Sequence, residues 1–269
     1  IAIGQNALGA QTTPSNNIAI GNNAGQVNDT GDGFVVIGYR SGAALTAGST
    51  QNTFVGYEAG AAVTTGDYNV MIGGAAGDAQ TTASHSTFVG FGAGGAVTTG
   101  QHNTIIGSHA GDAITTGHSL VAMGHNALGA VTDATYCVAV GREAGMTLTS
   151  AAGNTLLGHA AGAYISSGAN NTCLGYLAGD ALTSGHENVY VGLNAGGTAT
   201  TAGYNICIGN GAGNGGVTTG DHNIVMGHAA GDALTSASNN VIIGQSAGTT
   251  LTTGANNVAI GAEALYYTT

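Results

Sequence analysis

The sequence contains no lysine and no tryptophan, a single proline, three cysteines and few charged residues. Arg40 and Arg142 are its only basic residues, against 13 acidic ones, and the formal net charge is -11. Without lysine the chain cannot build a Walker-type phosphate loop or form a Schiff base with a substrate. Its acidity argues against nucleic acid, whose phosphates require cationic contacts, and against an anionic membrane surface. No apolar run approaches the roughly 18 residues that membrane insertion requires.

Glycine, by contrast, accounts for 50 of the 269 residues. A glycine preceded by an aliphatic residue recurs along the whole chain, with 13 intervals of 17 residues and two of 18, at Gly4, Gly21, Gly38, Gly56, Gly73, Gly90, Gly107, Gly124, Gly141, Gly158, Gly175, Gly192, Gly209, Gly227, Gly244 and Gly261. A short fixed period is typical of a solenoid, in which each repeat forms one coil. We therefore predict an all-β, parallel β-solenoid (β-roll) of about 16 coils, in one repeat domain over residues 1–269.

Each coil is numbered here from this glycine as position 0. Position −3 is β-branched in every unit, as at Val70 and Thr104, and position −1 is always Ile, Val, Leu or Met. Such side chains favour a strand, whereas glycine every few residues would cost a helix about 1 kcal/mol each. We expect a second strand in the Ala-Gly-x-x-Leu-Thr-Thr segment that follows. The glycines at 0, +4 and often +10 should form corners at positive φ or close backbone approach.

Position −2 is apolar in every unit, apart from the partly polar Tyr190. If −3 and −1 face the coil interior, −2 points outwards, because side chains alternate along a strand. A soluble monomer does not expose so long an apolar row, so the sequence predicts a homotrimeric fibre; burial under a second sheet of the same coil is the alternative. The predicted oligomer interface comprises Val36, Phe54, Met71, Phe88, Ile105, Leu156, Cys173, Tyr190, Cys207, Val225 and Ile242.

Asparagine at position −4 forms another regular row. It occurs at Asn17, Asn52, Asn69, Asn103, Asn154, Asn171, Asn188, Asn205, Asn223, Asn240 and Asn257. Stacked amides can hydrogen-bond from coil to coil. A turn role, in which Asn adopts a left-handed φ, is equally compatible with this pattern.

Two forms of the repeat resemble known families. Asn17-Ile-Ala-Ile-Gly and Asn257-Val-Ala-Ile-Gly resemble the core of YadA-like trimeric autotransporter adhesin heads. The longer form, as in Leu251-Thr-Thr-Gly-Ala-Asn-Asn-Val-Ala-Ile-Gly, is similar to repeats of phage tail fibres. The resemblance implies a trimeric β-roll in a tail fibre or similar appendage, extracellular or on the virion surface, that supports host attachment. A bacterial adhesin head is the alternative.

The threonines at +8 suggest a third function. Thr64, Thr81 and Thr98 belong to a rank of this kind that runs along the coils, and such ranks resemble those of ice-binding solenoids. A ladder of β-branched side chains within the sheet explains the same rank without a ligand.

The remaining chemistry indicates neither an enzyme nor a cofactor. Cys173 and Cys207 lie two coils apart, about 9.6 Å, which is too far for a disulfide, so these cysteines and Cys137 are predicted to be buried apolar groups. His85 and His102 fall on adjacent coils but at a position that also accepts other residues, so no metal site is predicted. Besides its own copies, the predicted partners are a host-surface glycan or protein, with possible surface contacts at Tyr39, Tyr57, Phe91 and Tyr176.

Overall fold

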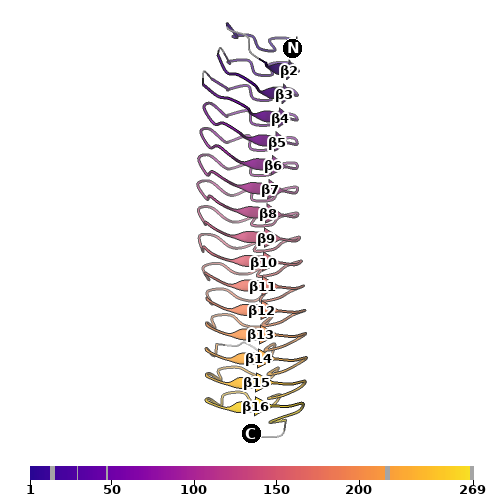
Figure 1. Ribbon diagram of the computed structural model, residues 1–269, viewed down its shortest axis with the longest axis vertical. Coiled ribbons are helices and arrows are strands. Elements are labelled where there is room, and N and C mark those ends of the chain that lie inside the picture. Colours follow the sequence, from indigo (N-terminus) through magenta and orange to yellow (C-terminus); the bar gives the residue numbers. More distant parts are fainter. Residues whose placement is uncertain (13–15, 29, 47, 216–218, 267–269) are drawn as a thin grey trace. The chain divides into compact units, whose positions relative to one another are not determined.

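A computed structural model describes residues 1–12, 16–28, 30–46, 48–215 and 219–266. The chain divides into two compact units, Ile1–Thr135 and Tyr136–Thr269. Each is a parallel β-solenoid with one short strand per coil (Figure 1), which confirms the all-β solenoid fold. The single domain over 1–269 stays a prediction.

The strands are two or three residues long and follow one another in chain order. In the first unit they are β1 (Ala2–Ile3), β2 (Ile18–Ile20), β3 (Val35–Ile37), β4 (Thr53–Val55), β5 (Val70–Ile72), β6 (Thr87–Val89), β7 (Thr104–Ile106) and β8 (Val121–Met123). In the second they are β9 (Val138–Val140), β10 (Thr155–Leu157), β11 (Thr172–Leu174), β12 (Val189–Val191), β13 (Ile206–Ile208), β14 (Ile224–Met226), β15 (Val241–Ile243) and β16 (Val258–Ile260). Strands β2–β16 occupy positions −3 to −1, as the sequence predicted, and β1 occupies positions −2 and −1.

Within each unit, equivalent positions of successive coils lie side by side. In the pair β6 and β7, for example, Thr87 lies opposite Thr104 and Phe88 opposite Ile105. The two 18-residue intervals leave this pairing unchanged, since Val35 pairs with Thr53 and Ile206 with Ile224. Strands therefore pair through equivalent positions of the repeat, whether the interval between them is 17 or 18 residues.

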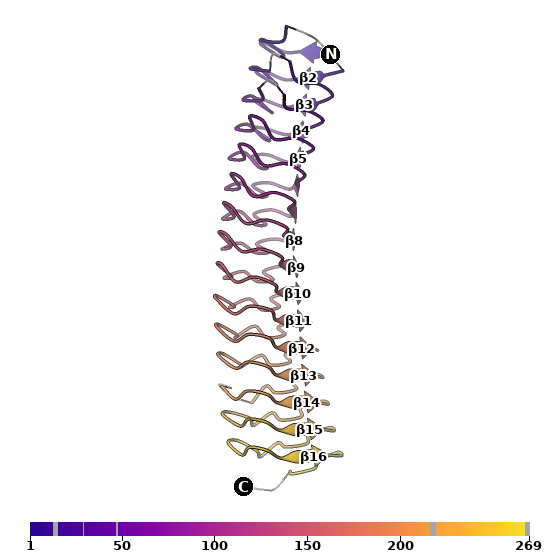
Figure 2. The same cartoon turned by 60° about the vertical axis from the view of Figure 1, so that its left-hand side comes forward.

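The segment after each strand consists of turns and not of the predicted second strand. Positions +2 and +4 have left-handed backbone, as at Glu58 (φ 54°) and Gly60 (φ 59°), and so does position −5. A left-handed residue reverses the chain direction, so an extended strand cannot pass through it. In Figure 2 the strands of each unit follow the right-hand side of the coils, and most of the turns extend to their left.

Glycine at position 0 is required by geometry, as predicted. At Gly90 the φ is +135°, and a Cβ there would lie 2.6 Å from the carbonyl oxygen of Gly107 on the next coil. An L-residue rarely adopts this φ, and no side chain could move to relieve a contact with backbone.

The −2 side chains point into the coil, so their predicted role as an oligomer interface is wrong. The 11 predicted residues are between 0% and 5% exposed within the chain that carries them: Val36, Phe54, Met71, Phe88, Ile105, Leu156, Cys173, Tyr190, Cys207, Val225 and Ile242. The turns close over them, with Ala at +3 and an aliphatic residue at +7, such as Ala93 and Val97, equally buried. These side chains therefore form the core of each unit. A second sheet, the alternative considered above, is not what buries them.

Candidate functional site

The outward rows at −3 and −1 form an apolar surface along the strands of each unit, called here the apolar outer face. It spans β1–β8 in the first unit and β9–β16 in the second. Its side chains range from half-buried to exposed: Ile72 is 40% exposed and Leu157 46%. All are aliphatic or Thr, and none is charged, in a chain with a net charge of -11. A contiguous uncharged face of this kind is a candidate for contact with other protein.

Stacked rings lie on the coils beside these strands. At position −5, Tyr68, His85 and His102 stack in sequence with ring centroids 5.0 and 5.3 Å apart. In the second unit Tyr204 stacks on His222 at 4.8 Å. The sequence places His85 and His102 on adjacent coils, and the same 17-residue spacing from Tyr68 is the signal for the stack, which was not predicted.

The four aromatic residues predicted as surface contacts are exposed. Tyr39 and Tyr57 stack on each other at 5.3 Å, and Phe91 and Tyr176 are 61% and 51% exposed. Phe91 packs edge-on against His109, and Tyr176 stacks on His159. Contact with a glycan stays a prediction.

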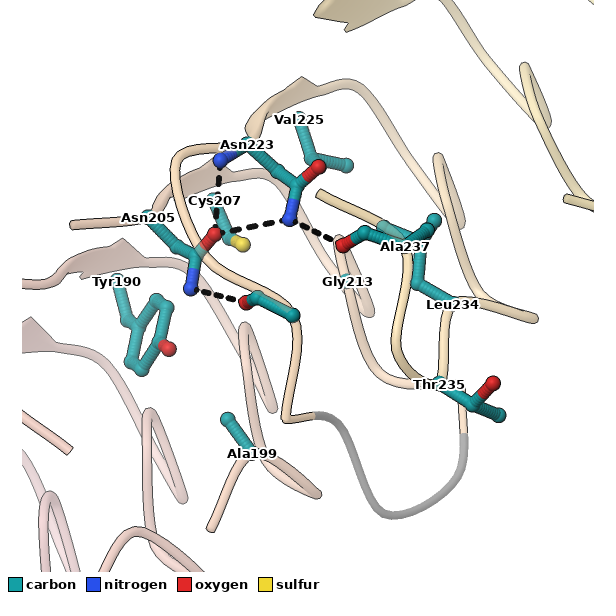
Figure 3. Close-up of a pocket in the computed structure, with 11 residues that line it drawn as sticks. Tyr190, Ala199, Asn205, Cys207, Gly213, Asn223, Val225, Leu234, Thr235 and Ala237 are labelled. Carbon is teal, nitrogen blue, oxygen red and sulfur yellow. Dashed lines mark hydrogen bonds between the residues drawn. The ribbon is translucent and has the colours of Figure 1, made fainter. Parts of the chain in front are cut away.

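The asparagines at −4 form a coil-to-coil ladder, one of the two roles that the sequence left open. In the second unit the Nδ2 of Asn223 donates to the Oδ1 of Asn205 at 3.0 Å and to the carbonyl of Ala237 at 2.8 Å (Figure 3). In the first unit, the Oδ1 of Asn52 accepts the backbone N–H of Asn69 at 2.9 Å. The left-handed turn residue is at −5 and not at −4. The asparagines therefore fasten successive coils from inside the core.

The threonines at +8 also join coils. The Oγ1 of Thr64 donates to the carbonyl of Thr81 at 3.1 Å, and the Oγ1 of Thr81 donates to the carbonyl of Thr98 at 3.2 Å. The same arrangement recurs in the second unit, from Thr183 to Thr200 at 3.0 Å. These hydroxyl protons are therefore used within the chain.

Cys137, Cys173 and Cys207 are buried and are not joined in disulfides, as predicted. Burial raises the pKa of Cys173 and of Cys207 to about 12, so both remain thiols at neutral pH. Among the described residues, no group of three His, Cys, Asp or Glu side chains is placed to hold a metal ion.

A small cavity of about 20 Å³ lies in the core of the second unit. Tyr190, Ala199, Cys207 and Leu234 are among the side chains around it (Figure 3). Ala199 occupies position +7, where Leu182 and Leu234 stand in other coils, so less volume is filled there. The cavity holds about one water molecule, which makes it a packing defect and not a substrate site.

No helix in the described part of the chain has the length and apolarity of a membrane span. No protein-family model matches the chain, and the comparisons with curated proteins and with solved structures give no match.

Proposed function

We propose that this chain is a structural segment of a homotrimeric fibre, in a phage tail fibre or a similar extracellular appendage that supports attachment to a host surface. The observation that carries the proposal is the apolar outer face. A long uncharged face on a strongly acidic chain is suited to burial against other protein. The proposed contact involves positions −3 and −1 and not position −2. The reason for association is still an apolar row that another chain would cover.

The internal bonding suits a load-bearing role. Each coil is joined to the next by parallel strand pairing, by the asparagine ladder inside and by the threonine hydroxyls at the turn. To separate two coils, all three sets of bonds must break together. A shaft built in this way resists local unfolding and proteolysis.

Ice binding receives less support from the structure. An ice-binding surface needs hydroxyls that are free to order water, whereas the +8 hydroxyls donate to carbonyls of the following coil. The bacterial adhesin head uses the same trimeric architecture, and the genes beside this one would distinguish it from a phage fibre.

The molar mass in solution tests the proposal. Light scattering should give three times the chain mass of 25.8 kDa. Ile72→Glu with Val89→Glu, on the outer face of adjacent coils, should lower the mass, because two charges per copy would be buried. Thr82→Glu with Thr99→Glu places the same charges at exposed turn positions of those coils and should leave the mass unchanged. A monodisperse, folded monomer of the unaltered chain would overturn the proposal.

A further inference from the structure

We infer that the copies meet through the apolar outer face, parallel and in register, with row −3 of one copy against row −1 of its neighbour at the same coil. The inference rests on the proposed function and adds the surface, the partner and the orientation.

The charge distribution identifies another copy as the partner. Two chains of charge -11 repel each other wherever their carboxylates approach. On the outer face, rows −3 and −1 carry no charge in any coil, so two such faces can meet without burying a carboxylate. A basic partner would instead need acidic side chains on the contact surface.

The face of each unit has the size of a patch that marks contact with other protein. A unit presents eight strands, and at about 4.8 Å per strand and about 3.3 Å per residue its strip measures roughly 400 Å². Exposed apolar patches of about 300–600 Å² are often functional.

The repeat adds a second condition on the partner. Side chains of each row recur once per coil, at the spacing of paired strands, so the face is corrugated with a period of about 4.8 Å. Ridges of one face fit the grooves of another over many coils only if both have the same period. A second copy of this chain meets this condition along every strand.

The two rows differ in size, and this difference sets the orientation. Row −3 contains threonine at Thr53, Thr87, Thr104, Thr155 and Thr172. Row −1 contains no threonine and includes the longer side chains of Met123, Leu157, Leu174 and Met226. Parallel copies, related by rotation about an axis along the coils, place row −3 of one copy against row −1 of the next. The smaller side chains of one row then pack against the larger side chains of the other. Antiparallel copies would pair like with like and leave a wedge-shaped gap, which close packing disfavours.

Paired cysteines test the contact. The double variant Thr87→Cys with Val89→Cys should form covalent trimers under mild oxidation, because the thiol introduced at position 87 of each copy would meet the thiol introduced at position 89 of the next. The two positions of one chain are separated by about 6.6 Å along the strand and point the same way, which disfavours a disulfide within it. Thr172→Cys with Leu174→Cys repeats the test in the second unit.

Several features make the result interpretable. The three native cysteines are buried, so the introduced thiols are the accessible ones. Thr82→Cys with Thr116→Cys places two thiols on exposed turns two coils apart, too far for a disulfide within the chain, and should give no covalent trimer. Circular dichroism should show that each variant keeps its β structure. A trimeric mass without covalent trimers from either outer-face pair would overturn the inference and leave the proposed function standing. A monomeric mass for the unaltered chain would overturn both.

Discussion

Replacing Asn188 by alanine should destabilise the second unit strongly. The side chain is fully buried. Its Nδ2 donates to the carbonyl of Ala202 at 2.8 Å and to the Oδ1 of Asn171 at 3.0 Å, and its Oδ1 accepts the N–H of Asn205 at 3.0 Å. Asn188→Ala leaves the Asn205 N–H and the Ala202 carbonyl without these partners. At about 1–3 kcal/mol for each buried orphan, the loss comes to about 4 kcal/mol.

Urea-induced unfolding followed by circular dichroism measures the free energy of unfolding. Amide hydrogen exchange at Asn205 locates the effect, because a solenoid can open one coil at a time. The matched control is Asn210→Ala, an exposed side chain at position +1 of the same unit, which should change stability by less than about 0.5 kcal/mol. Equal stability of Asn188→Ala and Asn210→Ala would refute the ladder as a source of stability.

Three further outcomes follow from the backbone, the thiols and the carboxylates. Gly90→Ala should lower the melting temperature sharply, because φ is +135° and the new Cβ meets the carbonyl of Gly107, whereas Gly95→Ala, with no contact under 3.4 Å, should be tolerated; equal melting would contradict the corner argument. Cys173 and Cys207, whose pKa burial raises to about 12, should resist thiol reagents at pH 8 until the chain unfolds, and rapid labelling of folded protein would show that they are accessible. Burial raises the pKa of Asp78, so its ionisation opposes folding as pH rises through the folded-state pKa. Asp78→Asn should therefore stabilise the fold at pH 7 and lose that advantage at pH 3, and a gain of equal size at both values would rule out ionisation as the cause.

The period, the place of each strand and the asparagine ladder were predictable because each depends on residues that recur at one position. β-Branched and aliphatic side chains at −3 and −1 located the strand, and Asn at −4 located the ladder. The turns at +2 and +4 were harder to predict. Asn, Glu, His, Ala and Leu as well as Gly adopt the left-handed conformation at +2, so the residue type at this position does not predict it.

Hydrophobicity could not predict which of the two faces of each strand points into the coil. Phe88 and Val89 are both apolar, yet Phe88 is fully buried and Val89 is partly exposed. The turns decide between the two faces, because they bring Ala93 and Val97 over the −2 side. A sequence that is apolar on both faces of a strand indicates that both are covered, but it does not identify which one is covered by the chain itself.

The coil from Gly38 to Gly56 has one residue more than most, and its location has a practical consequence. The N–H of Thr46 bonds to the carbonyl of Thr64, 18 residues on, while the hydroxyl of Ser49 bonds to Gly66, 17 residues on. The spacing of the bonds between these two coils therefore changes from 18 to 17 residues between Thr46 and Ser49. Added length there does not shift β3 against β4. An epitope or a tether inserted between Thr46 and Ser49 should therefore leave the pairing of β3 with β4 unchanged.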